Sequence, residues 1–210
     1  MGFELWVEQN KDGGAMTIAE PKTKTYTAEE YLALEMESEV RSEFRDGAIV
    51  EMTGGTPEHN EITGTLIFLL KAVLRRRPYS IFVTDQRLWI PDRNLYTYPD
   101  VMVTPRPVEL KPGRKDTVMN PILIAEVLSE STRSYDRDEN FSAYRTIPTL
   151  QEYVLIDQYQ PYVEQYVKQA EHQWLFTEYS DLDASFTLSS VSVEIALADL
   201  YEAIDFERGD

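Results

Sequence analysis

One acidic residue interrupts the most hydrophobic stretch of this sequence. Residues 121–128 read PILIAEVL, and Glu126 is the only charged side chain among them. A continuous apolar run of this length is typical of a central β-strand that is buried on both faces. An ionised carboxylate buried there costs several kcal/mol unless a cation or several hydrogen-bond donors compensate its charge. The run therefore predicts both a core strand and a partner for Glu126.

A second acid precedes this strand. Asp100 follows Tyr98 and Pro99, at a point where an apolar alternation resumes with Val101 and Val103. Two acids on neighbouring strands can share a divalent ion, because oxygen ligands suit Mg²⁺ and Mn²⁺. The alternative is structural: Asp100 would be an ordinary turn residue after proline, and Glu126 would pair with an arginine. Spacing alone leaves both interpretations open.

The composition narrows the chemistry available to the chain. Its 210 residues include 37 acidic and 20 basic residues, a formal net charge of −17, no cysteine and two histidines. The absence of cysteine excludes disulfides, thiolate zinc sites and a cysteine nucleophile. The acidic balance opposes non-specific binding of nucleic acid. With no apolar run near twenty residues and no signal-peptide pattern, we expect a cytoplasmic protein.

The order of the expected elements predicts an α/β fold. Thr27 and Glu30 form a capping box for a short helix, a hairpin turns at Asp46 and Gly47, and apolar residues at helical spacing predict a long helix around 62–73. A further helix is expected over 135–146, and strands over 81–90, 96–103, 121–128, 153–157, 161–168, 174–179 and 191–195. We expect a flexible segment over 1–20 and, over 21–210, a single domain with a mixed central sheet flanked by helices.

Several short segments follow one another in a characteristic order: 43–47 (EFRDG), 59–60 (HN), 98–101 (YPDV), 121–129 (PILIAEVLS), 131–132 (ST), 135–137 (YDR), 144–145 (YR) and 151–157 (QEYVLID). Together they resemble the Uma-type restriction endonuclease family of the PD-(D/E)xK nuclease superfamily, over most of the chain from about residue 26 to residue 201. The resemblance implies a restriction-endonuclease-like fold and Mg²⁺-dependent hydrolysis of DNA phosphodiester bonds.

The resemblance also implies roles for individual residues. Asp100 and Glu126 would hold Mg²⁺ or Mn²⁺ on adjacent core strands, with the backbone carbonyl of Val127 as a further ligand. Glu43 resembles an additional acid that superfamily nucleases supply from an earlier element. A pairing of Glu43 with Arg41 or Arg45 on the hairpin explains that residue equally well.

The chain departs from the superfamily at the lysine that positions the attacking water. Leu128 occupies its usual place, and Asn140 stands where Uma-type members often carry it on the following helix. Asparagine can hydrogen-bond a water but supplies no positive charge, and losing such a group costs on the order of 10² to 10⁴ in rate. Three outcomes remain open: slow cleavage with the metal alone, assistance by Arg137 or Arg145, or binding without cleavage.

The remaining candidates are basic residues and one histidine. Arg87, Arg137 and Arg145 are candidates for contacting a substrate phosphate, against structural pairing for Arg87 and ordinary surface charge for the other two. His59 is expected to act in helix capping more than in substrate contact, and 75–77 (RRR) to form a solvated helix end.

Assembly and function leave two further expectations. A homodimer is expected, because cutting both DNA strands needs two sites and two-fold symmetry is the commonest closed assembly. The alternative function is a non-cleaving nucleic-acid-binding or protein-interaction domain on the same fold.

Overall fold

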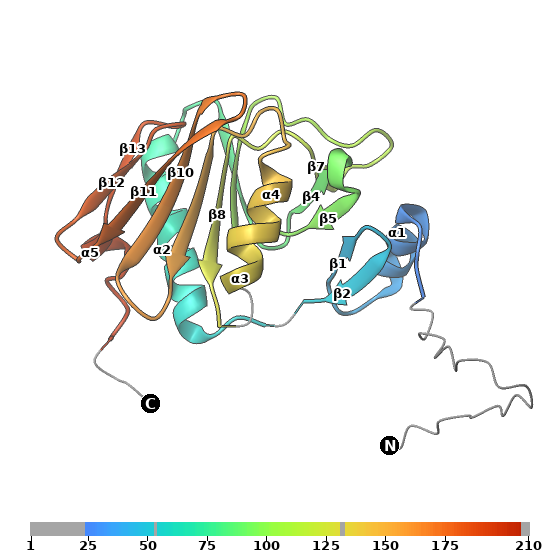
Figure 1. Cartoon of the computed structure of the whole chain (residues 1–210), viewed down its shortest axis with the longest axis horizontal. Coiled ribbons are helices and arrows are strands. Elements are labelled where there is room, and N and C mark those ends of the chain that lie inside the picture. The colour runs from blue at the N-terminus through green and yellow to red at the C-terminus, as the bar shows by residue number, and fades with distance from the viewer. Residues whose placement is uncertain (1–23, 53, 131–132, 207–210) are drawn as a thin grey trace, which may run out of the picture.

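A computed structural model describes residues 24–52, 54–130 and 133–206 of the chain (Figure 1). The segment expected over 1–20 lies outside these residues. The helical elements are α1 (Ala28–Glu37), α2 (Pro57–Leu74), the 3₁₀ turn η1 (Pro91–Arg93), α3 (Arg133–Tyr135), the π-helical turn η2 (Asp136–Asn140), α4 (Phe141–Tyr144) and α5 (Leu197–Leu200). In the described part of the chain, no helix is both long enough and apolar enough to span a membrane.

The strands form three sheets. A six-stranded mixed sheet has the order β11 (Gln173–Ser180), β10 (Tyr162–Ala170), β9 (Glu152–Asp157), β8 (Leu123–Leu128), β6 (Val101–Pro105) and β3 (Tyr79–Val83). A five-stranded sheet has the order β2 (Ala48–Glu51), β1 (Ser42–Arg45), β5 (Leu95–Thr97), β4 (Arg87–Ile90) and β7 (Thr117–Val118). The strands β12 (Ser185–Leu188) and β13 (Val193–Ala196) form a separate pair.

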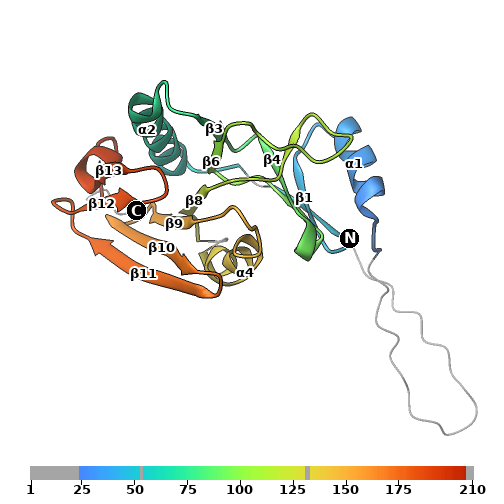
Figure 2. The same cartoon turned by 90° about the horizontal axis from the view of Figure 1, so that it is seen from above.

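Helices cover both faces of the six-stranded sheet, with α2 on one face and α4 on the other (Figure 2). All six residues of β8 are buried, as its apolar sequence predicts. Because successive side chains of a strand point to opposite faces, Ala125 and Val127 pack with α2 whereas Ile124 and Leu128 pack with α4. Glu126 lies between Ile124 and Leu128 on the same face of β8, and its side chain therefore points toward α4.

The hairpin joins a smaller core. Asp46 and Gly47 both have positive φ angles, 43° and 99°, as a two-residue turn between twisted strands requires. Across the hairpin, Tyr31 of α1 packs against Phe44 of β1 and Tyr96 of β5. The expected helix start is confirmed as well, because Thr27 and Glu30 form both hydrogen bonds of a capping box.

Two expected strands are each divided between the sheets, which corrects the prediction from the sequence. The range 81–90 covers the second part of β3 and all of β4, with a turn at 84–86 between them. These two strands belong to different sheets. The range 96–103 contains β5 and β6 in the same way, and Pro99 lies at the break. A proline has no N–H to donate to the strand ladder, so Pro99 ends the strand pairing there. The apolar pattern of the sequence continues through this position and therefore does not reveal the break.

The expected helix over 135–146 contains an irregular turn. η2 is π-helical over five residues, between the short helices α3 and α4. Turns of this kind insert one residue into a helix and occur frequently at functional sites. Here the turn buries Asp136 and Asn140, at its two ends.

Candidate active site

The register of β6 and β8 places the two predicted metal ligands next to each other. Val101 pairs with Ala125 in the antiparallel ladder, so Asp100 stands opposite Glu126 one position further along. Opposite residues of antiparallel strands point to the same face, with Cβ atoms about 4.5–5.5 Å apart. The backbone N–H of Asp100 donates a 2.9 Å hydrogen bond to Glu126 Oε2. The two acids therefore share one face and one end of the sheet.

Hydrogen-bond donors from α4, α2 and β8 itself hold this acid pair. Tyr144 of α4 donates from its hydroxyl to Glu126 Oε1 at 2.6 Å. Asp100 Oδ2 accepts from the backbone N–H of Val127 at 2.8 Å and lies 3.0 Å from His59 Nε2. These donors compensate part of the cost of burying the two carboxylates.

Electrostatics at Glu126 favour its protonated form. Burial and then the negative charges of Asp100 and Asp136 raise the pKa of Glu126 well above its ordinary value, against the opposing hydrogen bonds from Asp100 and Tyr144. Three carboxylates thus act on one another in a space from which water is largely excluded. A bound cation would relieve this repulsion.

Asp136 and Asn140 reach the site from the π-helical turn. Asn140 Nδ2 donates to Asp136 Oδ1 at 2.7 Å, and the Tyr153 hydroxyl donates to the backbone carbonyl of Asp136 at 3.1 Å. Asn140 Oδ1 is buried and has no hydrogen-bond partner in the described structure. Among the described residues, Asn140 thus bonds to Asp136 and makes no hydrogen bond to Asp100 or Glu126. In the sequence, Asp136 stands out only as part of the segment 135–137 (YDR), because an Asp-Arg pair at a helix start is common on any protein surface.

His59 is the second residue to which sequence reasoning gave too little weight. It lies in the first turn of α2, whose N-cap Thr56 accepts a hydrogen bond from the backbone N–H of His59. Although burial favours the neutral imidazole, the hydrogen bond and charge of Asp100 and the charge of Asp136 raise the pKa of His59 above its ordinary value. The contact with Asp100 joins residues far apart in the sequence, so only a tertiary structure could reveal it.

Glu43 lies near the site without touching the acid pair. Its carboxylate binds Arg45 on the same strand and the Thr97 hydroxyl, so the expected pairing with Arg45 exists. The Arg45 guanidinium stacks over the Tyr135 ring, 3.7 Å from its centroid. The charge of Glu43 helps to raise the pKa of Tyr135 and Tyr144, after the larger effect of burial. Glu43 therefore belongs to the rim of the site.

The three predicted phosphate contacts differ in their surroundings. Arg87 is buried and its guanidinium binds the Tyr98 hydroxyl and the Asp116 carboxylate, so its donors already have partners. Arg137 forms three hydrogen bonds with Glu164 of β10. Arg145 is exposed at the end of α4 and has no ion pair in the described part of the chain.

The acid pair suits a hard divalent cation. Within residues 24–52, 54–130 and 133–206, no three histidine or acidic side chains are grouped as a complete metal site. Mg²⁺ does not require such a group, because it commonly binds one or two carboxylates and keeps waters or substrate phosphates as its other ligands. The donor set of Asp100 and Glu126 fits this chemistry, and the repulsion that raises the pKa of Glu126 points to the same kind of ion. The role of the Val127 carbonyl stays a prediction.

Comparison with known proteins places this geometry in a family. The sequence profile of Uma2, described as "Putative restriction endonuclease", matches residues 28–198. The chain is 43% identical over 171 residues to the uncharacterized protein sll1609 of Synechocystis sp., which covers 81% of this chain and 97% of that protein. It is 33% identical over 180 residues to the uncharacterized protein slr1290 of the same organism, which covers 85% of this chain and 92% of that protein.

A solved structure has the same fold. The crystal structure of a protein from Anabaena variabilis, described as a "putative nuclease", superposes with a TM-score of 0.70 at 20% identity, covering 84% of this chain and 98% of that one. The match confirms the expected α/β fold with a mixed sheet and flanking helices. Taken with the profile match over most of the chain, it confirms the resemblance seen in the sequence: the chain belongs to the Uma2 family.

Proposed function

We propose that this protein is a divalent-metal-dependent endonuclease that hydrolyses phosphodiester bonds in DNA. The observation that carries the proposal is the buried pair of Asp100 and Glu126 on adjacent strands. Neither acid forms an ion pair with lysine or arginine among the described residues, and His59 is the only basic side chain in contact with Asp100. An ordinary buried ion pair, the main structural explanation for such acids, does not account for this arrangement.

Each neighbouring group has a positioning role in this proposal. Val127 N–H and His59 hold Asp100, while Tyr144 and the Asp100 N–H hold the two oxygens of Glu126. A Mg²⁺ or Mn²⁺ ion at Asp100 and Glu126 would lower the pKa of water and neutralise charge on a phosphate. Because both acids are fixed before an ion arrives, little ordering is needed to bind it.

The helix after β8 supplies less positive charge than a typical superfamily member. Asn140 is neutral, and the Arg137 guanidinium is held by Glu164. Arg145 remains as an exposed cation on this helix, and we propose that it contacts substrate phosphate. Turnover is accordingly expected to be slow, since a positioned charge is commonly worth about 10²-fold or more in rate.

Nicking of supercoiled plasmid tests this proposal. The wild-type chain should nick the plasmid with Mg²⁺ or Mn²⁺, and both Asp100→Ala and a chelator should abolish nicking. Glu61→Gln is a suitable control because Glu61 is an exposed acid on α2. Nicking that persists in Asp100→Ala would contradict the assignment of the site.

A non-cleaving DNA-binding protein is the second candidate function, and the neutral Asn140 is the observation that favours it. This alternative predicts salt-sensitive binding of DNA, as expected when cations neutralise phosphates, with no nicking in Mg²⁺ or Mn²⁺. Binding without nicking, at protein concentrations that saturate the DNA, would decide in its favour.

We also propose that the active form is a homodimer, because one acid pair can cut only one strand at a time. Light scattering should give twice the monomer mass. In the plasmid assay, a dimer that cuts both strands should produce linear DNA at the same time as nicked circles, not long after them. A monomeric mass with nicked circles as the sole product would contradict this.

A further inference from the structure

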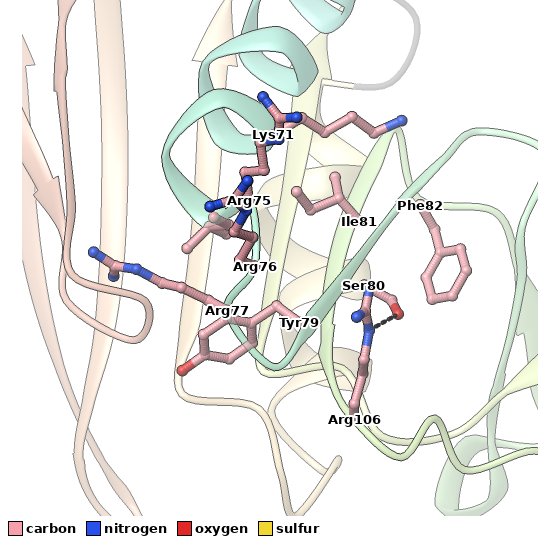
Figure 3. A pocket seen from close by; sticks show the side chains of 10 residues that line it. Lys71, Arg75, Arg76, Arg77, Tyr79, Ser80, Ile81, Phe82 and Arg106 are labelled. Atoms are coloured by element: carbon pink, nitrogen blue, oxygen red, sulfur yellow. Dashed lines mark hydrogen bonds between the residues drawn. The ribbon is translucent and has the colours of Figure 1, made fainter.

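A second concentration of charge lies at the other end of α2. Four arginines and one lysine line a cavity of about 410 Å³ between the end of this helix and β3, together with Tyr79, Ser80 and Phe82 (Figure 3): Lys71, Arg75, Arg76, Arg77 and Arg106. No acidic residue lines it. Lys71 follows His59 by twelve residues in α2, so about 18 Å of helix separates the near edge of this cavity from His59.

These five cations have no acidic partners among the residues that the structure describes. None forms an ion pair with a carboxylate in the described parts of the chain, although the protein has 37 acidic residues. By contrast, Arg45, Arg87, Arg133 and Arg137 all have such partners. The C-terminus of a helix carries a partial negative charge of only about half a unit, which offsets little of this cluster. The positive charges of the cluster are thus available to an anionic ligand.

The side chains combine anchored and free donors. Arg106 Nε donates to Ser80 Oγ at 3.1 Å, and Arg77 Nη1 donates to the backbone carbonyl of Val191 at 3.1 Å. Lys71, Arg75 and Arg76 are exposed, and their side chains make no hydrogen bond within the described residues. Figure 3 shows Lys71, Arg75 and Arg76 gathered at the end of α2, with Arg106 beside Ser80 across the cavity.

We propose that this cavity binds the phosphate group of a nucleotide, either free or at the end of a nucleic-acid chain. Guanidinium groups match the oxygens of phosphate with paired donors, and an ammonium adds a mobile point charge. The volume lies in the range of small-molecule pockets, and Tyr79 offers aromatic surface to a base or a sugar. The site is separate from the acid pair, so it does not depend on the proposed nuclease activity.

Calorimetric titration of the full chain, at low ionic strength and with a chelator present, tests the proposal. The ligands are inorganic phosphate, dAMP, and a short single-stranded oligonucleotide with or without a 5′-phosphate. Binding of dAMP, tighter than that of inorganic phosphate, would identify a free nucleotide as the ligand. Binding of the 5′-phosphorylated oligonucleotide, with neither dAMP nor the unphosphorylated oligonucleotide binding, would identify the end of a chain.

Variants locate the binding within the molecule. The double variant Lys71→Gln/Arg75→Gln should weaken the affinity for the phosphate ligand about tenfold or more, because two positive charges near the phosphate are removed. Lys115→Gln/Lys168→Gln removes the same charge elsewhere and should bind like the wild type. Asp100→Ala should also bind normally, so failure of the nuclease proposal would not be mistaken for failure of this one.

Three results would overturn the proposal: no binding of any ligand, equal weakening in the cavity variant and its control, or inorganic phosphate binding as tightly as every nucleotide. Misfolding is checked by comparing melting temperatures. The changed residues of the cavity variant are exposed and make no side-chain hydrogen bond among the described residues, so its melting temperature should equal that of the wild type.

Discussion

At the scale of single residues, Glu126 experiences both burial and repulsion from neighbouring carboxylates. Glu126 is buried at 7% exposure, beside Asp100 and within the field of Asp136. Hydrogen bonds from Tyr144 and the Asp100 N–H compensate only part of this cost, as the raised pKa of Glu126 shows. Such a residue lowers stability in the absence of a cation, which is a common property of binding sites.

The first prediction follows from that cost. With a chelator present, Glu126→Gln should raise the free energy of unfolding by about 1 kcal/mol or more. A glutamine avoids the cost of burying or protonating this carboxyl group, while it keeps an acceptor for the Asp100 N–H. For a chain of this size, the melting temperature should rise by about 2–4 °C per kcal/mol. The exposed control Glu61→Gln should stay within about 0.5 kcal/mol of the wild type.

Mn²⁺ should then reverse the order of stabilities. It should raise the melting temperature of the wild type, since a ligand at about 100 times its dissociation constant adds about 2.7 kcal/mol, and should have little effect on the variant. A lower melting temperature for Glu126→Gln in chelator, or an equal response of both proteins to Mn²⁺, would contradict this account.

The second prediction concerns Asn140. Asn140→Lys restores a cation next to Asp136 and removes a buried carbonyl oxygen that has no partner in the described structure, so plasmid nicking should become about tenfold to a hundredfold faster. Asn140→Met is the matched control, of similar length without the charge, and should not accelerate nicking. An unchanged or lower rate in Asn140→Lys would show that this position does not serve the reaction.

At the scale of elements, the first turn of α2 connects the helix to the site. Thr56 caps the helix and also donates to the Gln158 side chain at 2.5 Å, which ties the turn to the residue after β9. His59 projects from this turn to Asp100. Figure 1 shows the first turn of α2, the tip of β8 and α3 at the same end of the sheet. The site is thus assembled where several separate elements begin or end.

The third prediction uses two glycines just before this helix. A Cβ atom at Gly55 would lie 2.8 Å from His59 Nδ1, whereas one at Gly54 would have no neighbour within 4 Å. Gly55→Ala should therefore displace the imidazole from Asp100, weaken the Mn²⁺-induced rise in melting temperature and slow nicking. Gly54→Ala should leave both unchanged. Equal behaviour of the two variants would mean that the position of His59 does not matter to the acid pair.

At the scale of the whole molecule, the two faces of the six-stranded sheet differ in what packs against them. The α2 face forms the larger apolar core with β12, β13 and α5, whereas the α4 face carries the acid pair. Tyr201 packs at the edge of the first core. Its hydroxyl proton is shared between two backbone carbonyls, that of Asp157 at 2.8 Å and that of Tyr162 at 3.0 Å. We propose that residues 21–210 unfold as one domain, because this core joins elements from across the chain.

The fourth prediction is a loss of stability at high pH. Burial raises the pKa of Tyr201, so above about pH 10 the unfolded chain releases a proton that the folded chain retains. The unfolded state then binds fewer protons, and the free energy of unfolding falls as the pH rises, by up to about 1.4 kcal/mol per pH unit for each such group. Urea unfolding of Tyr201→Phe should show a shallower decline between about pH 10 and 11 than the wild type. Identical slopes would contradict the raised pKa.

Part of the fold could be predicted because its signals are local. The capping box, the hairpin turn and the long apolar helix each depend on residues within a few positions of one another. The two strand predictions that failed lacked such a signal, because the hydrophobic pattern runs through 81–90 and 96–103 while the chain passes from one sheet to the other. The short strands β7 and β12 were missed for a similar reason, since a few residues carry too little periodicity to detect.

By itself, the sequence determined that a carboxylate lies within a core strand and that the chain resembles a nuclease family, and it offered Asp100 as a partner without deciding between that pairing and a turn aspartate. Only the tertiary structure decided that His59, Asp136 and Tyr144 surround that pair and that Arg87 and Arg137 already have partners. It alone also decided that the cations at the end of α2 have no acidic partner within the part of the chain that the structure describes. The physical reason is that a strand buried on both faces leaves a local pattern of apolar residues in the sequence. The electrostatic environment of a side chain depends instead on strand register and on packing between segments far apart in sequence.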